Sequence, residues 1–316
     1  MKSVFKSFIA KSSFLQSAVV FLRNKLWLYR QIRIDKNALD QDIANFSKQG
    51  IQGLINGKQV IVSLTSFPAR INEVKYAIFS LLQQTVKPTK LILWLAFEQF
   101  PGREKDLPPE LLKLCDNGLS IEWCNDIRSY KKLIPSLVSY PNALVITADD
   151  DIFYPDTFVE KLLIEHAQYP DCVVAYRVHR INVKNGEVAP YDTWEKCVGN
   201  SKTSFLNFLT GAAGALYSSR LLHQDIIKSE LFMKLCPQAD DVWFNAMAVL
   251  NNTKVKIVQG GAFPLLYVNP ENEIAGVNTL AAYNNGLGGN DIQIRAVLDY
   301  YPVIKERIVK EAYIDS

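Results

Sequence analysis

The sequence predicts an α/β fold in which a mostly parallel sheet is flanked by helices. From Gly57 onward, short β-rich runs alternate with stretches of helical spacing, which is typical of βαβ units. Three of the runs are continuously apolar, as expected of strands that are covered on both faces of a sheet. The chain has 316 residues, of which 48% are hydrophobic and 21% charged, so it can bury a substantial core.

The expected elements follow one another in a regular order before the chain becomes less regular near residue 182. Strands are expected at residues 60–64, 91–95, 119–123, 143–147 and 173–176. Helices are expected between them, at residues 72–84, 108–116, 131–140 and 155–169. Further along, we expect a helix over 240–250, a strand over 256–259 and a last helix after the Gly- and Asn-rich segment 284–290. Because ligands bind beyond the carboxyl ends of such strands, chemistry is expected in the loops after Leu64, Leu95, Asn125 and Thr147.

The first 34 residues have the pattern of a basic amphipathic segment. They contain seven basic residues and no acidic one, interleaved with apolar side chains. The longest uncharged run, residues 12–22, has 11 residues, whereas a membrane-spanning helix needs about 20 apolar ones. A signal peptide is disfavoured because Lys11 adjoins this run and no small-residue cleavage site follows. Two interpretations stay open: a helix on an anionic membrane surface, and a helix docked on the protein's own core or on a partner.

The cysteines and the net charge exclude several classes of protein. The five cysteines are odd in number, scattered and never spaced as Cys-x-x-Cys, which fits neither a disulfide framework nor a zinc cluster. They predict reduced thiols in a cytosolic protein. The net charge of +3 is too small to indicate a nucleic-acid partner, so none is expected.

The strongest local signal is an acidic run at the end of a buried strand. The apolar segment 144–147 leads directly to Asp149, Asp150 and Asp151. Adjacent carboxylates repel one another, so this arrangement raises their pKa values or destabilises the fold unless a cation or strong donors neutralise them. On an extended segment alternate side chains share one side, so Asp149 and Asp151 are expected to converge on one ligand while Asp150 faces elsewhere.

Such a cluster suits a hard divalent cation. Mg²⁺ or Mn²⁺ binds one or two carboxylates and completes its shell with phosphate and water. The alternative is a solvated turn in which Asp150 or Asp151 caps the next helix. That alternative leaves unexplained why the charges gather at the end of a buried strand.

Four motifs along the chain together indicate a family. They are VSLTSFPARI at residues 62–71, SYKKL at 129–133, TADDDIFYP at 147–155 and ADDVWF at 239–244. In this order they resemble the motifs of GT-A glycosyltransferases close to family 2, and more narrowly those of bacterial enzymes of capsule and lipopolysaccharide synthesis. A single Asp-x-Asp motif is a weak signal, but four motifs over about residues 58–295 are a specific one. The resemblance implies a Rossmann-like, nucleotide-diphospho-sugar transferase fold.

The resemblance also implies roles for the residues of the donor half. The loop from Thr65 through Ser66 to Arg70 would receive the nucleotide, with Ser66 near the base or ribose and Arg70 near the diphosphate. Lys131 and Lys132 would offset phosphate charge. Asp149 and Asp150 would contact the donor, and Asp149 and Asp151 would hold the metal. The alternatives are a solvated arginine in a helix N-terminal loop and a surface lysine pair at a helix start.

On the acceptor side, the resemblance places the general base in the pair Asp240 and Asp241. A sugar hydroxyl is a poor nucleophile, and a carboxylate within hydrogen-bond reach can remove its proton. Asp241 is the first candidate and Asp240 the second. Because this sequence has Ala-Asp-Asp where many relatives carry Glu-Asp, the choice between the two stays open. The alternative is an acidic pair that complements the dipole of a helix in its first turn.

Three further segments are weaker candidates. The small-residue segment 210–215 would let the backbone approach a donor or acceptor closely, or would simply pack tightly. His179 is a candidate site residue, although a lone histidine in a strand is usually structural. Asn290 and Asp291 indicate a helix N-cap first, with a lid or a third metal ligand as the alternative.

Taken together, these patterns predict a basic amphipathic helical segment over residues 1–56, a catalytic domain over 57–275, and a C-terminal loop and helix over 276–316 that pack on it. The expected function is Mn²⁺- or Mg²⁺-dependent transfer of a sugar from a nucleotide sugar to a glycan or lipid-linked acceptor in surface polysaccharide synthesis. The expected location is the cytoplasm, either free or bound peripherally to the inner membrane through residues 1–34. One alternative is a sugar-phosphate nucleotidyltransferase, which is disfavoured because no Gly-rich loop follows Leu64. The other is a non-catalytic module that binds a metal or a partner.

Overall fold

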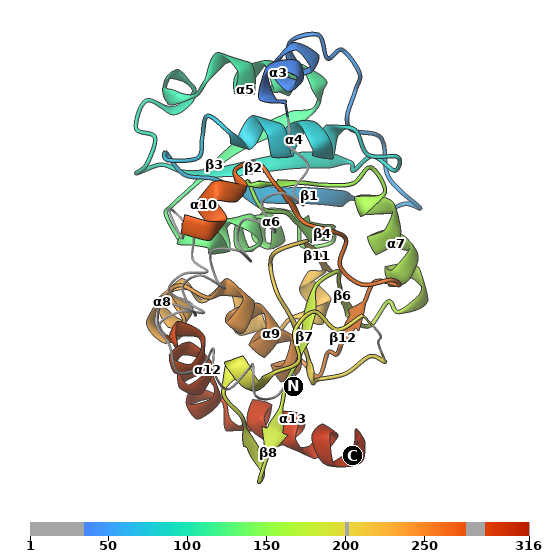
Figure 1. Cartoon of the computed structure of the whole chain (residues 1–316), viewed down its shortest axis with the longest axis vertical. Helices are drawn as coiled ribbons and strands as arrows, with labels where there is room; N and C mark the ends of the chain where they lie inside the picture. The colour runs from blue at the N-terminus through green and yellow to red at the C-terminus, as the bar shows by residue number, and fades with distance from the viewer. Residues whose placement is uncertain (1–34, 200–201, 276–287, 316) are drawn as a thin grey trace, which may run out of the picture.

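The computed structural model describes residues 35–199, 202–275 and 288–315, and a seven-stranded sheet forms its centre (Figure 1). Every pair of neighbouring strands is parallel except the two pairs that include β11, which runs antiparallel to both of its neighbours. The predicted α/β fold, with a mostly parallel sheet flanked by helices, is confirmed. The strand order is β3 (Leu119–Cys124), β2 (Lys90–Ala96), β1 (Val60–Thr65), β4 (Leu144–Thr147), β11 (Ala215–Tyr217), β6 (Val173–Ala175) and β12 (Val255–Ile257).

The central strands are apolar throughout because both faces of the sheet are covered. In β1, Val60, Val62 and Leu64 pack into the core on one face, and Ile61 packs into a cluster on the other. Val62 pairs with a leucine of β2 and with an isoleucine of β4, so the apolar character continues across the sheet. Such strands show no alternation in their sequence, which is why the continuous runs predicted them correctly.

Helices cover both faces of the sheet. In Figure 1, α3, α4 and α5 lie on one side of β1–β3 and α6 lies on the other. The first face carries α3 (Lys36–Ala44), α4 (Val74–Leu82), α5 (Pro109–Lys113) and α7 (Phe158–Gln168). The second carries α6 (Ile134–Ser139), α8 (Ser229–Leu235), α9 (Asp240–Leu250), α12 (Gly289–Tyr300) and α13 (Pro302–Asp315).

The remaining elements are short. Three two-stranded ladders pair β5 (Ile152–Phe153) with β13 (Leu266–Tyr267), β7 (Val178–Arg180) with β10 (Asn207–Leu209), and β8 (Val183–Lys184) with β9 (Glu187–Val188). Helix α10 spans Pro270–Ala275. The 3₁₀ turns are η1 (Arg103–Asp106), η2 (Leu114–Asn117), η3 (Arg128–Lys132), η4 (Tyr191–Thr193), η5 (Ser219–Leu221) and η6 (Gln224–Ile227).

The second half of the chain follows the sequence less closely. The helix expected over 240–250 is present with those bounds, and the strand expected at 256–259 lies at Val255–Ile257. The last helix is two helices, α12 and α13, because Pro302 follows a break at Tyr301. Strand β11 was not expected: it has only three residues, and its place between β4 and β6 is set by pairing with strands that are distant in sequence.

Two segments with predicted roles lie outside the described residues. Residues 1–34, and with them the basic amphipathic segment, lie outside the described residues, as do residues 276–287. Within the described part of the chain, no helix combines the length and the apolar character needed to span a bilayer. All five cysteines are free, as expected. The boundaries at residues 56 and 275 stay predictions.

Candidate active site

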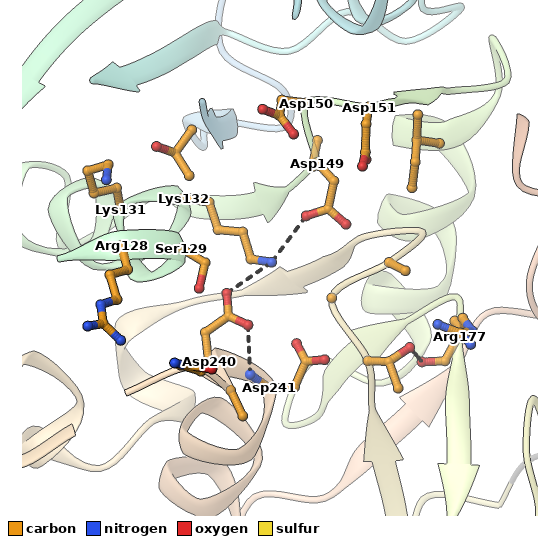
Figure 2. A pocket seen from close by; sticks show the side chains of 18 of the residues that line it. Arg128, Ser129, Lys131, Lys132, Asp149, Asp150, Asp151, Arg177, Asp240 and Asp241 are labelled. Atoms are coloured by element: carbon orange, nitrogen blue, oxygen red, sulfur yellow. Dashed lines mark hydrogen bonds and ion pairs between the residues drawn. The ribbon is translucent and has the colours of Figure 1, made fainter. Parts of the chain in front are cut away.

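A cavity of about 950 Å³ opens at the carboxyl ends of β1 and β4 and faces the first turn of α9 (Figure 2). Its volume is in the range of ligand sites in proteins. All the residues predicted for the site line this one cavity, although they come from four separate segments of the chain. They are Thr65, Ser66, Arg70, Lys131, Lys132, Asp149, Asp150, Asp151, Asp240 and Asp241.

The loop after β1 supplies hydrogen-bond donors to the acidic run. Ser66 donates from Oγ to Oδ2 of Asp150 at 2.6 Å. Arg70 donates from Nη1 to Oδ1 of Asp150 at 2.8 Å and to Oδ2 of Asp151 at 2.6 Å. Thr65 donates instead to the carbonyl oxygen of Trp94, at 2.8 Å, so its hydroxyl is engaged by the neighbouring strand.

The three adjacent carboxylates do not alternate as an extended segment would. Residues 150 and 151 lie in a turn, and Arg70 bonds both of their carboxylates, so Asp150 does not face away from Asp151 as expected. The turn replaces the extended geometry on which that expectation depended. Burial raises the pKa of Asp150, and the guanidinium of Arg70 and the hydroxyl of Ser66 oppose this rise.

Lys132 joins the two acidic groups of the cavity. Its Nζ lies 3.1 Å from Oδ1 of Asp149 and 3.0 Å from Oδ2 of Asp240 (Figure 2). Only 8% of its side chain is exposed. Burial lowers the pKa of Lys132 because it disfavours the charged ammonium. The combined attraction of the carboxylates of Asp149 and Asp240 is larger than this effect and holds the pKa well above 10.5. Lys132 therefore carries a positive charge between the end of β4 and the start of α9.

Lys131, the other lysine of the pair, has a different partner. Its Nζ lies 2.5 Å from Oδ1 of Asp126, in the loop after β3, and 2% of the side chain is exposed. Both lysines are buried, so the alternative of a solvated surface pair is wrong.

The first turn of α9 presents the two acids expected to include the general base. Asp240 is buried and accepts a hydrogen bond at Oδ1 from the backbone N–H of Asp241, at 2.9 Å. Burial, followed by the charge of Asp240, raises the pKa of Asp241 to about 7, although Lys132 opposes the rise. A carboxyl with this pKa can change protonation state near neutral pH, which a dipole-complementing surface acid would not do.

Gly211 allows the side chains of Asp241 and Lys132 to approach the backbone closely. A Cβ atom at position 211 would lie 2.6 Å from Nζ of Lys132 and 2.8 Å from Oδ1 of Asp241. At Gly211 the small-residue segment 210–215 therefore packs tightly against protein side chains, which is the alternative given for it, and its approach to a donor or acceptor stays a prediction.

The carboxylates at the end of β4 have the chemistry of a hard-cation site, but they form only part of one. Asp149 and Asp151 present oxygens to the cavity, with 24% and 21% of their side chains exposed. Among the described residues, no group of three or more His, Cys, Asp or Glu side chains is arranged to hold a metal ion. A Mg²⁺ or Mn²⁺ ion here would complete its shell with water and substrate phosphate, as is usual for Mg²⁺. It would also share these carboxylates with Lys132 and Arg70.

The weaker candidates have distinct positions. His179 lines the cavity and is 3% exposed; its Nδ1 accepts a hydrogen bond from the backbone of Cys197 at 3.0 Å. Burial lowers its pKa to about 4, so its imidazole is neutral. Asn290 lines the cavity at the start of α12, but the N-cap of that helix is Gly288, so the expectation of a cap at 290 or 291 is wrong. Asp291 accepts instead from the backbone of Tyr191, at 2.7 Å.

Sequence reasoning missed several basic residues of this cavity. Arg128, Arg177 and Lys196 also line it. Arg128 has a left-handed backbone, with φ of +56°, and donates to the carbonyl oxygen of Pro237 at 3.1 Å. Arg177 directly follows the expected strand at 173–176, a strand end at which no site was predicted, and Lys196 lies in the less regular part of the chain.

Among solved structures, the chain is similar to S. aureus TarS. The likeness to TarS 1-349 has a TM-score of 0.41 and 12% identity, and covers 77% of this chain and 72% of that one. The same fragment in complex with UDP gives a TM-score of 0.42 at 13% identity, with the same coverage. A 4-diphosphocytidyl-2C-methyl-D-erythritol synthase gives a TM-score of 0.38 at 9% identity, covering 65% of this chain and 90% of that one. Likenesses this remote define neither a donor nor a metal for this chain. No family model matches the sequence, and no curated protein matches it.

Proposed function

We propose that this chain is a glycosyltransferase that moves a sugar from a nucleotide-sugar donor to a glycan or lipid-linked acceptor. One observation carries the proposal: the residues of four sequence motifs, which lie far apart in the chain, line one cavity at the carboxyl edge of the sheet. Within it, the acids after β4 face the acids of α9 across Lys132. A metal-side acid cluster opposite a second acid pair is the arrangement that transfer between a donor and an acceptor needs.

In this proposal Asp241 acts as the general base. The acceptor hydroxyl would give its proton to the carboxylate of Asp241 while the hydroxyl oxygen bonds to the anomeric carbon and the bond to the nucleoside diphosphate breaks. A pKa of about 7 lets Asp241 be ionised at neutral pH and still accept this proton. Lys132 holds Asp240 beside it, so Asp240 is a positioning residue in this proposal.

The donor half would neutralise the diphosphate with the protein's own cations. Arg70, which is half-buried, and Lys132, which is buried, both line the cavity and are preorganised by their carboxylate partners. A Mn²⁺ or Mg²⁺ ion held by Asp149 and Asp151 would supply further charge for the departing diphosphate. The hydroxyl of Ser66 fixes Asp150 at the wall of this half of the cavity.

The place of the reaction is also part of the proposal. A growing surface polysaccharide is often held on lipid, so an enzyme bound by its basic residues 1–34 to the cytoplasmic face of an anionic membrane would meet its acceptor more often. Transfer in capsule or lipopolysaccharide synthesis is the role that the four motifs favour.

A thermal-shift panel tests the donor half. Nucleoside diphosphates and nucleotide sugars are each added with and without Mn²⁺, and the matching diphosphate with Mn²⁺ is expected to stabilise the protein by about 2.7 kcal/mol at a hundred times its Kd. Because the carboxylates alone form an incomplete metal site, Mn²⁺ without nucleotide is expected to have a small effect. A double variant, Asp149→Asn with Asp151→Asn, should lose the Mn²⁺-dependent part, whereas Asp171→Asn at an exposed site should keep it.

The same panel discriminates the alternatives. Stabilisation by nucleoside triphosphates in preference to diphosphates would indicate a nucleotidyltransferase. Stabilisation by the metal alone, with no response to any nucleotide, would indicate a binding module. If no ligand stabilises the chain under any condition, the enzymatic proposal is wrong.

A further inference from the structure

Three basic side chains that line the cavity, Arg128, Arg177 and Lys196, form no ion pair among the described residues, and the last two lie close enough for their charges to interact. Arg70, Lys131 and Lys132 each form an ion pair with at least one carboxylate. In the described residues, neither Arg177 nor Lys196 forms one. Arg177 donates from Nε to Sγ of Cys197, at 3.4 Å, and a thiol is a weak acceptor. Lys196 donates to the carbonyl oxygen of Tyr191, at 2.5 Å.

Both basic groups are nevertheless held in place. The backbone carbonyl of Arg177 accepts a hydrogen bond from the backbone of Thr210, at 3.0 Å, which ties this residue to the loop that carries Gly211. The ammonium of Lys196 lies 3.3 Å from the centre of the Tyr191 ring, in a cation-π contact. The backbone of Arg177 is therefore fixed beside the cavity, and the exposed Lys196 side chain is held by its contacts with Tyr191.

The positive charges of Arg177 and Lys196 repel each other when no anion is bound between them. Burial lowers the pKa of Lys196, and the guanidinium of Arg177 lowers it further. Nearby carboxylates raise this pKa and so oppose both effects. The pKa of His179 beside them is lowered by burial first and then by both cations. The charges of Asp192, which is exposed, and of Asp291, which accepts from the backbone of Tyr191, favour the ammonium of Lys196, but neither acid forms an ion pair with it. A bound anion would relieve this repulsion.

The position of the pair relates it to the acceptor rather than to the donor. In Figure 2, Arg177 lies across the cavity from Arg128 and Lys131, with the acids of α9 between them. Tyr191, which Lys196 contacts, is close enough to Asp241 for that carboxylate to raise its pKa, after burial. The cations that face the acids after β4 are other residues, Arg70 and Lys132.

We propose that Arg177 and Lys196 form a subsite for an anionic group, a phosphate or a carboxylate, carried by the acceptor. Arg binds both groups through parallel hydrogen bonds, and Lys adds a point charge. The subsite deepens the proposed function, on which the assignment to the acceptor rests. It restricts the acceptors to glycans or lipid-linked glycans that bear an acidic sugar or a phosphate near the hydroxyl that reacts.

The test compares two probes that differ in charge, glucose 6-phosphate and methyl glucoside, by isothermal titration. The full chain is first saturated with the nucleoside diphosphate and Mn²⁺ combination that stabilises it most, so that the donor half is filled. Glucose 6-phosphate is expected to bind at least about tenfold more tightly than methyl glucoside, as charge-assisted hydrogen bonds to an anion require. Arg177→Gln and Lys196→Gln should each reduce this preference, and the double variant should abolish it. Arg220→Gln, at an exposed arginine elsewhere, should leave it unchanged.

The outcomes show whether Arg177 and Lys196 bind an anion of the acceptor or the diphosphate of the donor. If Arg177→Gln weakens the nucleoside diphosphate as much as it weakens glucose 6-phosphate, Arg177 serves the donor and the proposal is wrong. Equal binding of both probes by the unaltered protein would also overturn it. Should Arg177→Gln fail to fold, Arg177→Lys and Lys196→Gln decide the same question. Failure of the proposed function is read independently, because without any nucleotide response the two probes can still be compared on the free protein.

Discussion

Replacing Asp241 with asparagine is expected to stabilise the protein at alkaline pH. Asparagine has nearly the same shape as aspartate but carries no charge, so it removes the cost of holding a carboxylate beside Asp240 at a partly desolvated position. The pKa of Asp241 is raised from 3.8 to about 7, so the folded state binds its proton more tightly than the unfolded chain does. The stabilising effect of that proton is complete below about pH 4 and is lost as the pH rises through 7.

The size of this effect follows from the pKa. The interval from 3.8 to about 7 corresponds to roughly 4 kcal/mol, at about 1.4 kcal/mol for each pH unit. Oδ1 of Asp241 is buried, but the residue as a whole is half-buried and lines an open cavity, so solvent screens part of this energy. We expect a gain of about 2–4 kcal/mol for Asp241→Asn at pH 8 and a much smaller gain at pH 4.

Urea unfolding of the two proteins between pH 4 and pH 9 measures this difference. The difference in the free energy of unfolding should grow between pH 4 and pH 7 and then stay level. Asp171→Asn serves as the control, because that side chain is 87% exposed and its replacement should change stability by less than about 0.5 kcal/mol at any pH. A difference between Asp241→Asn and the unaltered protein that does not vary with pH would show that the carboxyl ionises normally, and the argument for its role as base would fail.

In a transfer assay Asp241→Asn should lose about 10²- to 10⁴-fold in kcat, and the unaltered enzyme should gain rate as the pH rises through 7.

Three further changes test the surroundings of this base. Lys132→Met leaves buried carboxylates without their cation and should cost about 3–5 kcal/mol in urea unfolding. Lys305→Met, at the solvent-exposed ion pair with Glu187, should cost less than about 1 kcal/mol, and equal losses would contradict the bridging role of Lys132. Gly211→Ala places a methyl group against the ends of two charged side chains and should lower kcat at least about tenfold with the fold retained. Gly53→Ala, where a methyl group would meet open space, should have no such effect, and a fully active Gly211→Ala enzyme would refute the close approach. Ser66→Ala removes a hydroxyl that bonds a buried carboxylate and should cost about 1–3 kcal/mol, more at pH 8 than at pH 5; an unchanged midpoint in urea at pH 8 would exclude that bond.

Much of the fold could be predicted because its central strands carry their own signal. The apolar runs of β1, β2 and β4 are buried on both faces, and the helices between them have clear spacing and start signals. Strand β11 could not be predicted, because three residues are too few for a periodic pattern and their pairing is decided by the tertiary structure. The metal and donor roles of the acids after β4 stay predictions.

The sequence predicted those site residues that follow a strand or begin a helix. It did not predict which of these residues form ion pairs with one another. The motifs placed Lys131 and Lys132 together, but the structure gives them separate partners, Asp126 and the acids at Asp149 and Asp240. Those partners follow other strands or begin a distant helix, so only the folded chain brings them together. The same holds for Arg177 and Lys196, which belong to no motif.

The ammonium of Lys132 has one further consequence. The ammonium of Lys132 forms ion pairs with acids on both sides of the cavity. A ligand that binds Asp149 would therefore weaken the ion pair between Asp149 and Lys132 and strengthen the one between Lys132 and Asp240. In the proposed enzyme, donor binding would therefore change the electrostatic surroundings of Asp240 without a moving loop or a hinge. By thermodynamic reciprocity, binding of the acceptor would change the affinity for the donor by the same factor.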